Sequence, residues 1–358
     1  DVKLTDNHDL TQLKTINEAT GGAITFFKND ITLKGGAADL SKALNGTNYA
    51  GDVEISNNHD LPELVTINNA TSGSITLANN AVKLSGSTAD LAAALNGVPS
   101  YSGVVEITDN ASDIDATSVT SIANAMKVGI KPVITKTPNI KGNAADVVTA
   151  LGKITNTGNA NIKLDNPHNT TQLKSINDAT TGSITFNDDT VKLTGTAAVV
   201  TAALNGITGY KGAVTLDDPH NQAQLIAINN ATDGAITFND TSVKLSGSVA
   251  DVGAALAGVT GYTGEVDITD TGSDISATSI TAIADATNKT PVITKTPNIK
   301  GNAADVVTAL GKITNTGNAN IKLDNAHDLT QLQTINNATT GSITFNDASV
   351  KLSGTTCL

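Results

Sequence analysis

Aspartate and histidine recur together in this chain of 358 residues, in a pattern that could bind divalent cations. In the first copy, Asp6-Asn7-His8 lies between a predicted strand and a predicted helix. Carboxylate oxygens are ligands that calcium prefers, so a column of these side chains at strand ends could hold a row of ions. The candidate ligands are Asp6, His8, Asp109, Asp113, Asp165, His168, Asp217, His220, Asp270, Asp274, Asp324 and His327.

The same residues also suit turns and helix caps. Asp, Asn and Pro form turns, and an Asp or Asn just before a helix accepts hydrogen bonds from its first amides. The chain contains neither D-x-[DN]-x-[DN]-G nor GGxGxD, the patterns of known calcium loops, and His is missing from two copies, at Ala111 and near Thr271. The sequence favours structural caps, and calcium is the only cofactor that stays open.

The chain lacks the features of an active site. All five His occupy one position of a repeat, and there is no G-x-S-x-G, no Walker A loop and no G-x-G-x-x-G between a strand and a helix. An active site needs different residues that converge once, whereas here each candidate residue recurs along the chain. We therefore predict a protein that is not an enzyme.

The aromatic residues follow the same rule. The four Tyr stand two residues before a Gly that opens a strand, and Phe recurs at a third position of the repeat, where Leu77 replaces it once. A broken stripe of tyrosines could contact a cell-surface polysaccharide, but packing inside the fold is favoured. These residues are Tyr49, Tyr101, Tyr210, Tyr262, Phe26, Phe186, Phe238 and Phe345.

Internal repeats dominate the sequence. Residues 132–166 recur without change as residues 291–325, a shift of 291 − 132 = 159 residues. That shift is three units of about 53 residues, the period at which solenoid repeats are sought. Within each unit a motif typified by HDLTQLKTINEAT at His8 alternates with one typified by GGAADLSKALNG at Gly35.

Each unit combines short helices and short strands. In the first motif Leu10, Leu13 and Ile16 recur at steps of three and indicate one face of a helix. The second motif, AADLSKAL, predicts another helix, which Asn-Gly ends. Alternating runs at 23–27, 31–35 and 52–56 predict strands with one apolar face, so an extra strand follows the first type of helix.

These elements predict an α/β solenoid of short parallel strands and short helices, with two coils per unit. One unit buries little apolar surface alone, so neighbouring coils must stack into a continuous core. Helices on one side of the strands and helices on alternating sides are both compatible with the sequence. We expect one solenoid domain over 1–358, with units at about 1–52, 53–105, 106–161, 162–213, 214–266, 267–320 and, in part, 321–358.

Composition excludes several classes of protein. The formal charge is −12, and all 22 basic residues are Lys. Because phosphate and base recognition relies heavily on Arg, we expect no nucleic-acid binding. No apolar stretch is long enough to span a membrane. A single cysteine, Cys357, can form neither an internal disulfide nor a cysteine-built zinc site.

The repeats resemble those of very large cell-surface and secreted proteins of cyanobacteria and other aquatic bacteria. The segments that carry the resemblance are AADVVTALG at Ala144, GYTGEVDITD at Gly261 and LTQLQTINNATTGSITF at Leu329, and related copies cover essentially the whole chain. The resemblance implies an extracellular, adhesin-like or matrix-forming protein and brings no catalytic residues with it.

The ends of the sequence suggest a mode of assembly. Asp1 begins inside a unit, Leu358 stops where a helix of the second type is expected, and neither end reads as a capping repeat. Open strand edges can pair with another chain. We therefore expect an extracellular structural repeat protein whose copies join end to end into a fibre, sheath or surface layer. The alternative is the stalk or binding module of a large adhesin, with or without a dependence on calcium.

Overall fold

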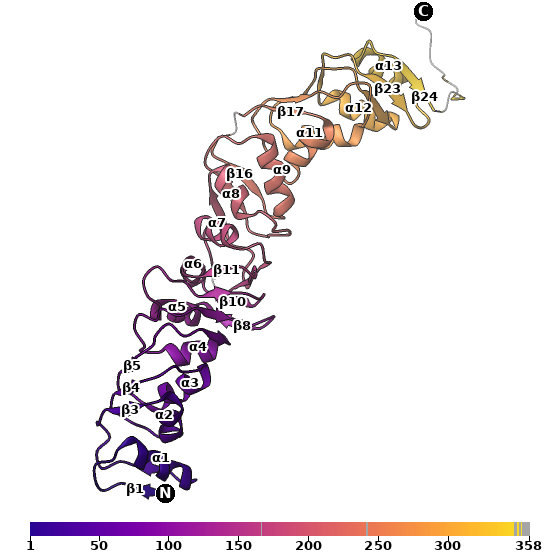
Figure 1. Ribbon diagram of the computed structural model, residues 1–358. Helices are drawn as coiled ribbons and strands as arrows, with labels where there is room; N and C mark the ends of the chain where they lie inside the picture. The colour runs from indigo at the N-terminus through magenta and orange to yellow at the C-terminus, as the bar shows by residue number, and fades with distance from the viewer. Residues whose placement is uncertain (166, 241–242, 347–348, 351, 353–358) are drawn as a thin grey trace, which may run out of the picture. The chain divides into compact units, whose positions relative to one another are not determined.

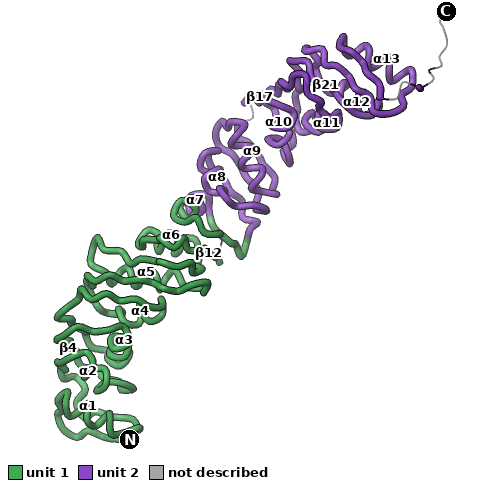
Figure 2. The backbone as a smooth tube through the Cα atoms, turned by 45° about the vertical axis from the view of Figure 1, so that its right-hand side comes forward, with its two compact units in different colours: residues 1–168, 175–188 green, residues 169–174, 189–358 purple. Residues whose placement is uncertain are grey.

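The computed structural model describes residues 1–165, 167–240, 243–346, 349–350 and 352. Cys357 and the truncated motif expected at Gly354 lie outside these residues. The described chain forms two compact units, one of residues 1–168 and 175–188 and one of residues 169–174 and 189–358 (Figure 2).

Each coil consists of a strand segment followed by a helix (Figure 1). The described residues form α1 (Leu10–Ala19), α2 (Ala37–Leu44), α3 (Leu61–Ala70), α4 (Thr88–Leu95), α5 (Ala116–Ala125), α6 (Ala144–Lys153), α7 (Thr170–Ala179), α8 (Ala197–Ala203), α9 (Gln222–Ala231), α10 (Val249–Leu256), α11 (Ala277–Ala286), α12 (Ala303–Gly311) and α13 (Leu329–Ala338).

The strands of the described residues pair in parallel, as the sequence predicts. The first unit contains the sheets β1 (Val2–Lys3)–β2 (Ile24–Thr25), β3 (Leu33–Gly35)–β4 (Val53–Ile55)–β5 (Ile75–Leu77), β6 (Leu84–Gly86)–β7 (Val105–Ile107)–β9 (Val133–Ile134)–β11 (Thr155–Asn156) and β8 (Asp113–Asp115)–β10 (Asn139–Gly142)–β12 (Asn161–Leu164)–β13 (Ile184–Phe186). The second contains β14 (Leu193–Gly195)–β15 (Val214–Leu216)–β16 (Ile236–Phe238), β17 (Leu245–Gly247)–β18 (Val266–Ile268)–β20 (Val292–Ile293)–β22 (Thr314–Asn315) and β19 (Asp274–Ser276)–β21 (Asn298–Gly301)–β23 (Asn320–Leu323)–β24 (Ile343–Phe345).

The extra strand explains why the repeat spans two coils. Ile75 in β5 pairs with Val53 of the preceding coil. Leu84 in β6, further along the same coil, pairs instead with Val105 of the next coil. The hydrogen-bonded ladder therefore moves sideways within this coil, and one sheet ends where the next begins.

Within each unit the helices lie on one side of the strands. Helices that follow one another in sequence pack against each other, from α1 to α6 in the first unit and from α8 to α13 in the second (Figure 1). Helices on alternating sides would separate these neighbours by the sheet. The structure thus decides between the two arrangements that the sequence left open.

The core lies between the strands and the helices. Val53 and Ile55 of β4 point inward, while Glu54 between them is only half-buried. Leu64 and Ile67 of α3 have the predicted three-residue spacing and are fully buried. The same pattern in every coil gives the α/β repeat solenoid that the sequence predicts.

Candidate functional site

The five histidines of the repeat lie inside the fold, with 3 to 9% of their surface exposed. The rings of His59 and His220 bond to a tyrosine of a later coil: His59 Nε2 lies 3.1 Å from Tyr101 Oη, and His220 Nε2 lies 3.0 Å from Tyr262 Oη. The aromatic positions that recur in the sequence therefore meet in the core.

The tyrosine fixes which histidine nitrogen carries the proton. Tyr101 Oη donates its only hydrogen to the carbonyl oxygen of Val82, at 2.6 Å. It can only accept from His59, so Nε2 of that ring is protonated. His59 Nδ1 then has a lone pair, and it is buried without a hydrogen-bond partner. Tyr262 and Val243 impose the same state on His220.

Burial also shifts the acid–base behaviour of these rings. It lowers the pKa of His59 and of His220 below the ordinary value of 6.5, against the opposing effect of nearby carboxylates. It raises the pKa of Tyr101 and of Tyr262 to about 12. Both groups are therefore neutral at pH 7, as buried polar groups without a charged partner must be.

The histidine rings also pack against other aromatic rings, as His220 does against Phe238 at 4.8 Å. His8 contacts both Phe26 and Tyr49, with ring centroids 5.3 and 5.8 Å away, and neither of its nitrogens has a hydrogen-bond partner. His168 lies 4.9 Å from Phe186, and His327 stacks on Phe345 at 4.8 Å. These histidines serve the core as aromatic rings.

Two of the candidate aspartates, Asp109 and Asp270, cap helices. Asp109 Oδ2 accepts hydrogen bonds from the amide and the hydroxyl of Thr88, both at 2.7 Å. Asp270 accepts from the amide of Val249 at 2.7 Å. Each carboxylate thus binds the first residue of a helix in the preceding coil, and not a helix of its own coil.

Two residues absent from the sequence-based set make the same contact. Asn57 accepts from the amide of Ala37 at 2.9 Å, and Asp218 accepts from the amide of Ala197 at 2.7 Å. All four lie two residues after a strand, and this spacing was the available signal. Residues Asp9 and Asp60 cap their own helices, through Gln12 and Glu63.

The remaining aspartates of the turn lie elsewhere. Asp217 accepts from Asn239 Nδ2 at 2.9 Å. Asp324 pairs with Lys300 at 3.8 Å. The main-chain amide of Asp165 donates to Gly142, while Asp6 is exposed in the first coil. Sequence position grouped these residues with Asp109, but their side chains have different surroundings.

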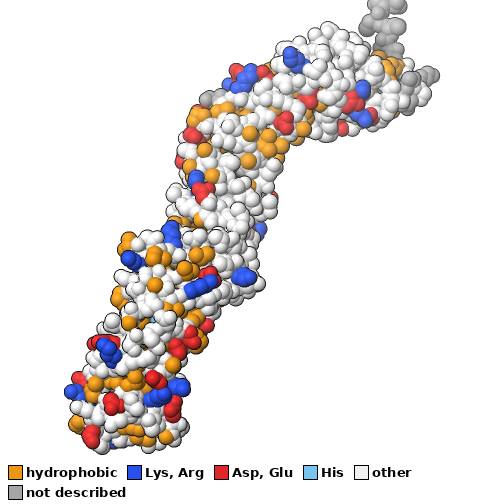
Figure 3. Space-filling model, viewed as in Figure 1, with side chains coloured by type: hydrophobic (Ala, Val, Ile, Leu, Met, Phe, Trp, Pro, Cys, Tyr) orange, Lys and Arg blue, Asp and Glu red, His pale blue; other side chains and the backbone are white. Residues whose placement is uncertain are grey.

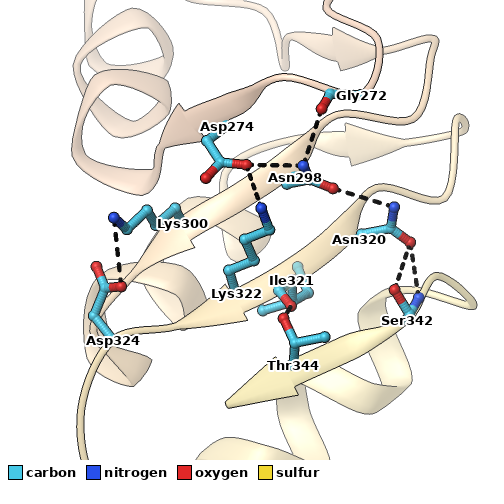
Figure 4. Close-up of polar contacts among 10 residues, drawn as sticks. All are labelled: Gly272, Asp274, Asn298, Lys300, Asn320, Ile321, Lys322, Asp324, Ser342 and Thr344. Atoms are coloured by element: carbon cyan, nitrogen blue, oxygen red, sulfur yellow. Dashed lines mark hydrogen bonds and ion pairs between the residues drawn. The ribbon is translucent and has the colours of Figure 1, made fainter. Parts of the chain in front are cut away.

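Asp113 and Asp274 belong to polar ladders on the outer face of the sheets. Asp274 Oδ1 accepts from Asn298 Nδ2 at 2.8 Å and from Lys322 Nζ at 2.6 Å (Figure 4). Asn320 then bonds Asn298 at 3.3 Å, and Ser342 bonds Asn320 at 2.9 and 3.0 Å. The ladder crosses all four strands from β19 to β24.

The first unit repeats this ladder. Asp113 accepts from Asn139 at 2.8 Å and from Lys163 at 2.6 Å, and Asn161 links Asn139 to Ser183. The hydrogen bond from the lysine is the main cause that lowers the pKa of Asp113 and of Asp274. These carboxylates are therefore charged and already held by protein donors.

An open groove adjoins the ladder of the second unit. It encloses about 560 Å³ and is lined by Asp274, Lys300, Asn302, Asp305 and Asp324, among others. In the described part of the chain, no three His, Cys, Asp or Glu side chains are grouped so that they could hold a metal ion. Calcium binding by the Asp and His column therefore stays a prediction.

The outer surface carries mixed charge. On the face shown in Figure 3, Lys side chains lie beside Asp and Glu in small groups over both units. Several of these groups are ion pairs, such as Lys83 with Glu106 at 2.8 Å and Lys244 with Asp267 at 2.7 Å. Among the described helices, none is both long and apolar enough to cross a bilayer.

Comparisons with known proteins give little beyond this geometry. No protein-family model matches the chain, and no curated protein matches it significantly. Among solved structures, the LRR ectodomain of the Arabidopsis receptor kinase HAESA, in complex with a peptide hormone, is 12% identical, with a TM-score of 0.21; the match covers 90% of this chain and 61% of that one. A TDR receptor is 8% identical, with a TM-score of 0.18 and coverage of 90% and 56%. The chain thus spans less than two thirds of either receptor chain.

Proposed function

We propose that this chain is a non-enzymatic structural repeat element of an extracellular fibre, sheath or surface layer, in which copies associate end to end. One observation carries the proposal: the side chains that could do chemistry recur in the repeats and are engaged in contacts between coils. The His59–Tyr101–Val82 contact returns as His220–Tyr262–Val243. A group that holds coils together in several copies serves the scaffold.

The extracellular location is supported by composition and by the resemblance of the repeats. The chain is acidic, with a formal charge of −12, and contains one cysteine and no arginine. These features are consistent with the exported bacterial repeat proteins that the motifs resemble. Net charge far from zero also keeps an extended surface soluble.

A second candidate function is a binding module of an adhesin, and the groove beside Asp274 favours it. Lys300, Asn302 and Asp324 line this groove and offer both hydrogen-bond donors and acceptors. Such a surface suits the hydroxyl groups of a polysaccharide. Calcium would belong to this second function if the Asp and His column binds it.

Negative-stain electron microscopy of the folded, full-length chain tests the two functions. The sample is imaged in EDTA and in calcium chloride, and its mass is followed by light scattering. Uniform filaments in both conditions would support the structural function. Single particles in both, together with saturable binding to an acidic or neutral polysaccharide, would favour the binding module.

The role of calcium is decided in the same samples. Filaments that disappear in EDTA would require an ion, and the double variant D109N/D270N should then fail to assemble in calcium. If filaments are unaffected by EDTA and by this variant, the two aspartates act as caps only, because Asn also accepts hydrogen bonds from a helix terminus.

A further inference from the structure

The identical segments 132–166 and 291–325 make most of the same contacts with the coil that precedes each of them. We call them block 1 and block 2. Asn139 donates to Asp113 at 2.8 Å and Lys163 pairs with Asp113 at 2.6 Å; Asn298 and Lys322 contact Asp274 at the same distances. The main-chain amides of the two asparagines donate to Ser112 and Ser273, each at 2.8 Å. These shared hydrogen bonds do not distinguish the blocks. The differences come from the preceding coils: Thr137 donates to Asn110 at 3.0 Å in the first unit, and Asn298 donates to the carbonyl oxygen of Gly272 at 3.1 Å in the second.

The apolar contacts of the blocks match as well. Ile140 pairs with Ile114 in one unit and Ile299 with Ile275 in the other, and both block residues are fully buried. The helix contact differs in charge, since Lys153 bonds the amide of Asn124 whereas Lys312 forms an ion pair with Asp285. Because the two blocks have the same sequence, the coil before block 1 can make with block 2 the contacts that it makes with its own block.

We propose that two copies of this chain associate by unequal exchange of these blocks. In this dimer residues 1–131 of one copy stack on residues 291–358 of the second copy. Residues 1–290 of the second copy stack on residues 132–358 of the first. Residues 106–131 and residues 267–290 then each stack on a block of the same sequence as in the single chain. The face of residues 106–131 that block 1 covers in the single chain therefore also fits block 2 of another copy.

The loop before block 1 is suited to act as the hinge. It runs from Lys127 to Lys131, turns at Gly129 with φ of +89°, and leaves Val128 99% exposed. Short connections between interchangeable elements favour domain swapping, which forms dimers at low cost because the interfaces already exist. Repeat proteins misassemble in this way because their units resemble one another.

The exchange goes beyond the proposed function, since it depends on the two blocks and not on the ends of the chain. It is tested by cross-linking in a Cys357→Ser background. One batch carries Asp113→Cys and the other carries Asn298→Cys. In a single folded chain these positions lie in different units, whereas unequal exchange places them on neighbouring paired strands, as Asp113 and Asn139 are in the first unit.

Equal amounts of the two batches are unfolded in urea, refolded together and treated with a short bismaleimide. We expect a cross-linked dimer whose yield is within about twofold of that from Asp113→Cys mixed with Asn139→Cys, which reports exchange of block 1 for itself. A single chain with Asp113→Cys and Asn139→Cys is the control for correct folding and must cross-link internally.

Three results would overturn the proposal. The first is formation of the 113–139 dimer without the 113–298 dimer, which would mean that the chain distinguishes the two blocks. The second is the absence of both dimers when the folding control does cross-link. The third is an equal yield of the 113–298 dimer when the batches are mixed after folding, which would indicate contact between the surfaces of folded chains. Filament formation by chains that were never unfolded tests the proposed function and not this exchange.

Discussion

At the scale of single residues, the buried His–Tyr contacts show how polar groups are accommodated in a narrow core. Tyr101 Oη receives a hydrogen bond from His59 and donates one to Val82. The hydroxyl therefore satisfies two buried groups at once, and its removal leaves both unpaired. Each unsatisfied buried group costs about 1–3 kcal/mol, whereas the hydrogen bond itself contributes less.

We expect Tyr101→Phe to lower the free energy of unfolding by about 2–4 kcal/mol, because both partners lose their contact. Tyr49→Phe is the matched control, since Tyr49 Oη bonds only Ile31 and the nearby His8 has no hydrogen bond to lose. Its loss should be about half as large. Urea unfolding followed by far-UV circular dichroism measures both, and equal losses would contradict the two-partner role.

Stability should fall as the solution becomes acidic. Burial lowers the pKa of His59 and His220 in the folded state, so between that value and 6.5 the unfolded chain binds protons that the folded chain does not. The contribution of these rings is complete above about pH 6.5 and is lost below it, at up to about 1.4 kcal/mol per pH unit for each ring.

The variant His59→Gln separates this effect from general acid unfolding. Its side-chain amide can donate to Tyr101, as the ring does, but it does not titrate. Urea midpoints between pH 7.5 and pH 5 should decline less steeply in the variant than in the parent chain. Parallel declines would show that His59 does not titrate on unfolding.

At the scale of helices and strands, contacts between coils add to the contacts within each coil. Asp109 caps α4 from the next coil, and the Asp274 ladder ties four strands together. Such contacts fix the register between coils, because the donor and the acceptor belong to different turns of the solenoid.

Asp109→Ala should lower the free energy of unfolding by about 1 kcal/mol through loss of the cap on α4. Asp109→Asn should retain most of it, because Asn57 makes the same contact in the first repeat. Thermal unfolding in EDTA measures both. If calcium stabilised the parent chain but not the Asn variant, Asp109 would bind an ion instead.

Gly103 allows the segments that precede β6 and β7 to approach closely. A Cβ atom at this position would lie 2.0 Å from the carbonyl oxygen of Val82 and 2.8 Å from the ring of Tyr101. Gly103→Ala should therefore destabilise the fold by more than about 3 kcal/mol. Gly152→Ala, in α6 with open space around the site, should instead stabilise it by about 0.5–1 kcal/mol. Denaturant titration of the two variants checks the contrast in sign.

At the scale of the whole molecule, stability is a sum over neighbouring coils. In a solenoid each repeat contacts only its neighbours, so a local defect need not unfold the rest. The division of the described chain into two compact units agrees with this view.

Amide hydrogen exchange measures how far a defect spreads. With Gly103→Ala we expect faster exchange in peptides of the coils that flank β7, residues 80–130, and unchanged exchange in residues 189–340 of the second unit. The Gly152→Ala variant serves as the control. Accelerated exchange throughout both units would show that the molecule unfolds as one cooperative body.

Part of the fold and of the candidate site could be read from local patterns. The spacing of Leu64 and Ile67 predicts the buried face of a helix, and the alternation of Val53, Glu54 and Ile55 predicts a strand with one apolar face. The recurrence of His59 and Tyr101 in later repeats indicates a structural role. These inferences concern residues close together in the chain, where helix and strand periods decide which side chains share a face.

The sequence alone determined the period, the α/β solenoid class and the chemical inventory of this protein. Only the tertiary structure decided that the helices share one side, that Asp109 caps the preceding helix, and that His59 meets Tyr101. These contacts join residues of different coils, and their geometry depends on how one coil stacks on the next. That stacking follows from packing and from strand register over the whole ladder, which no local period specifies.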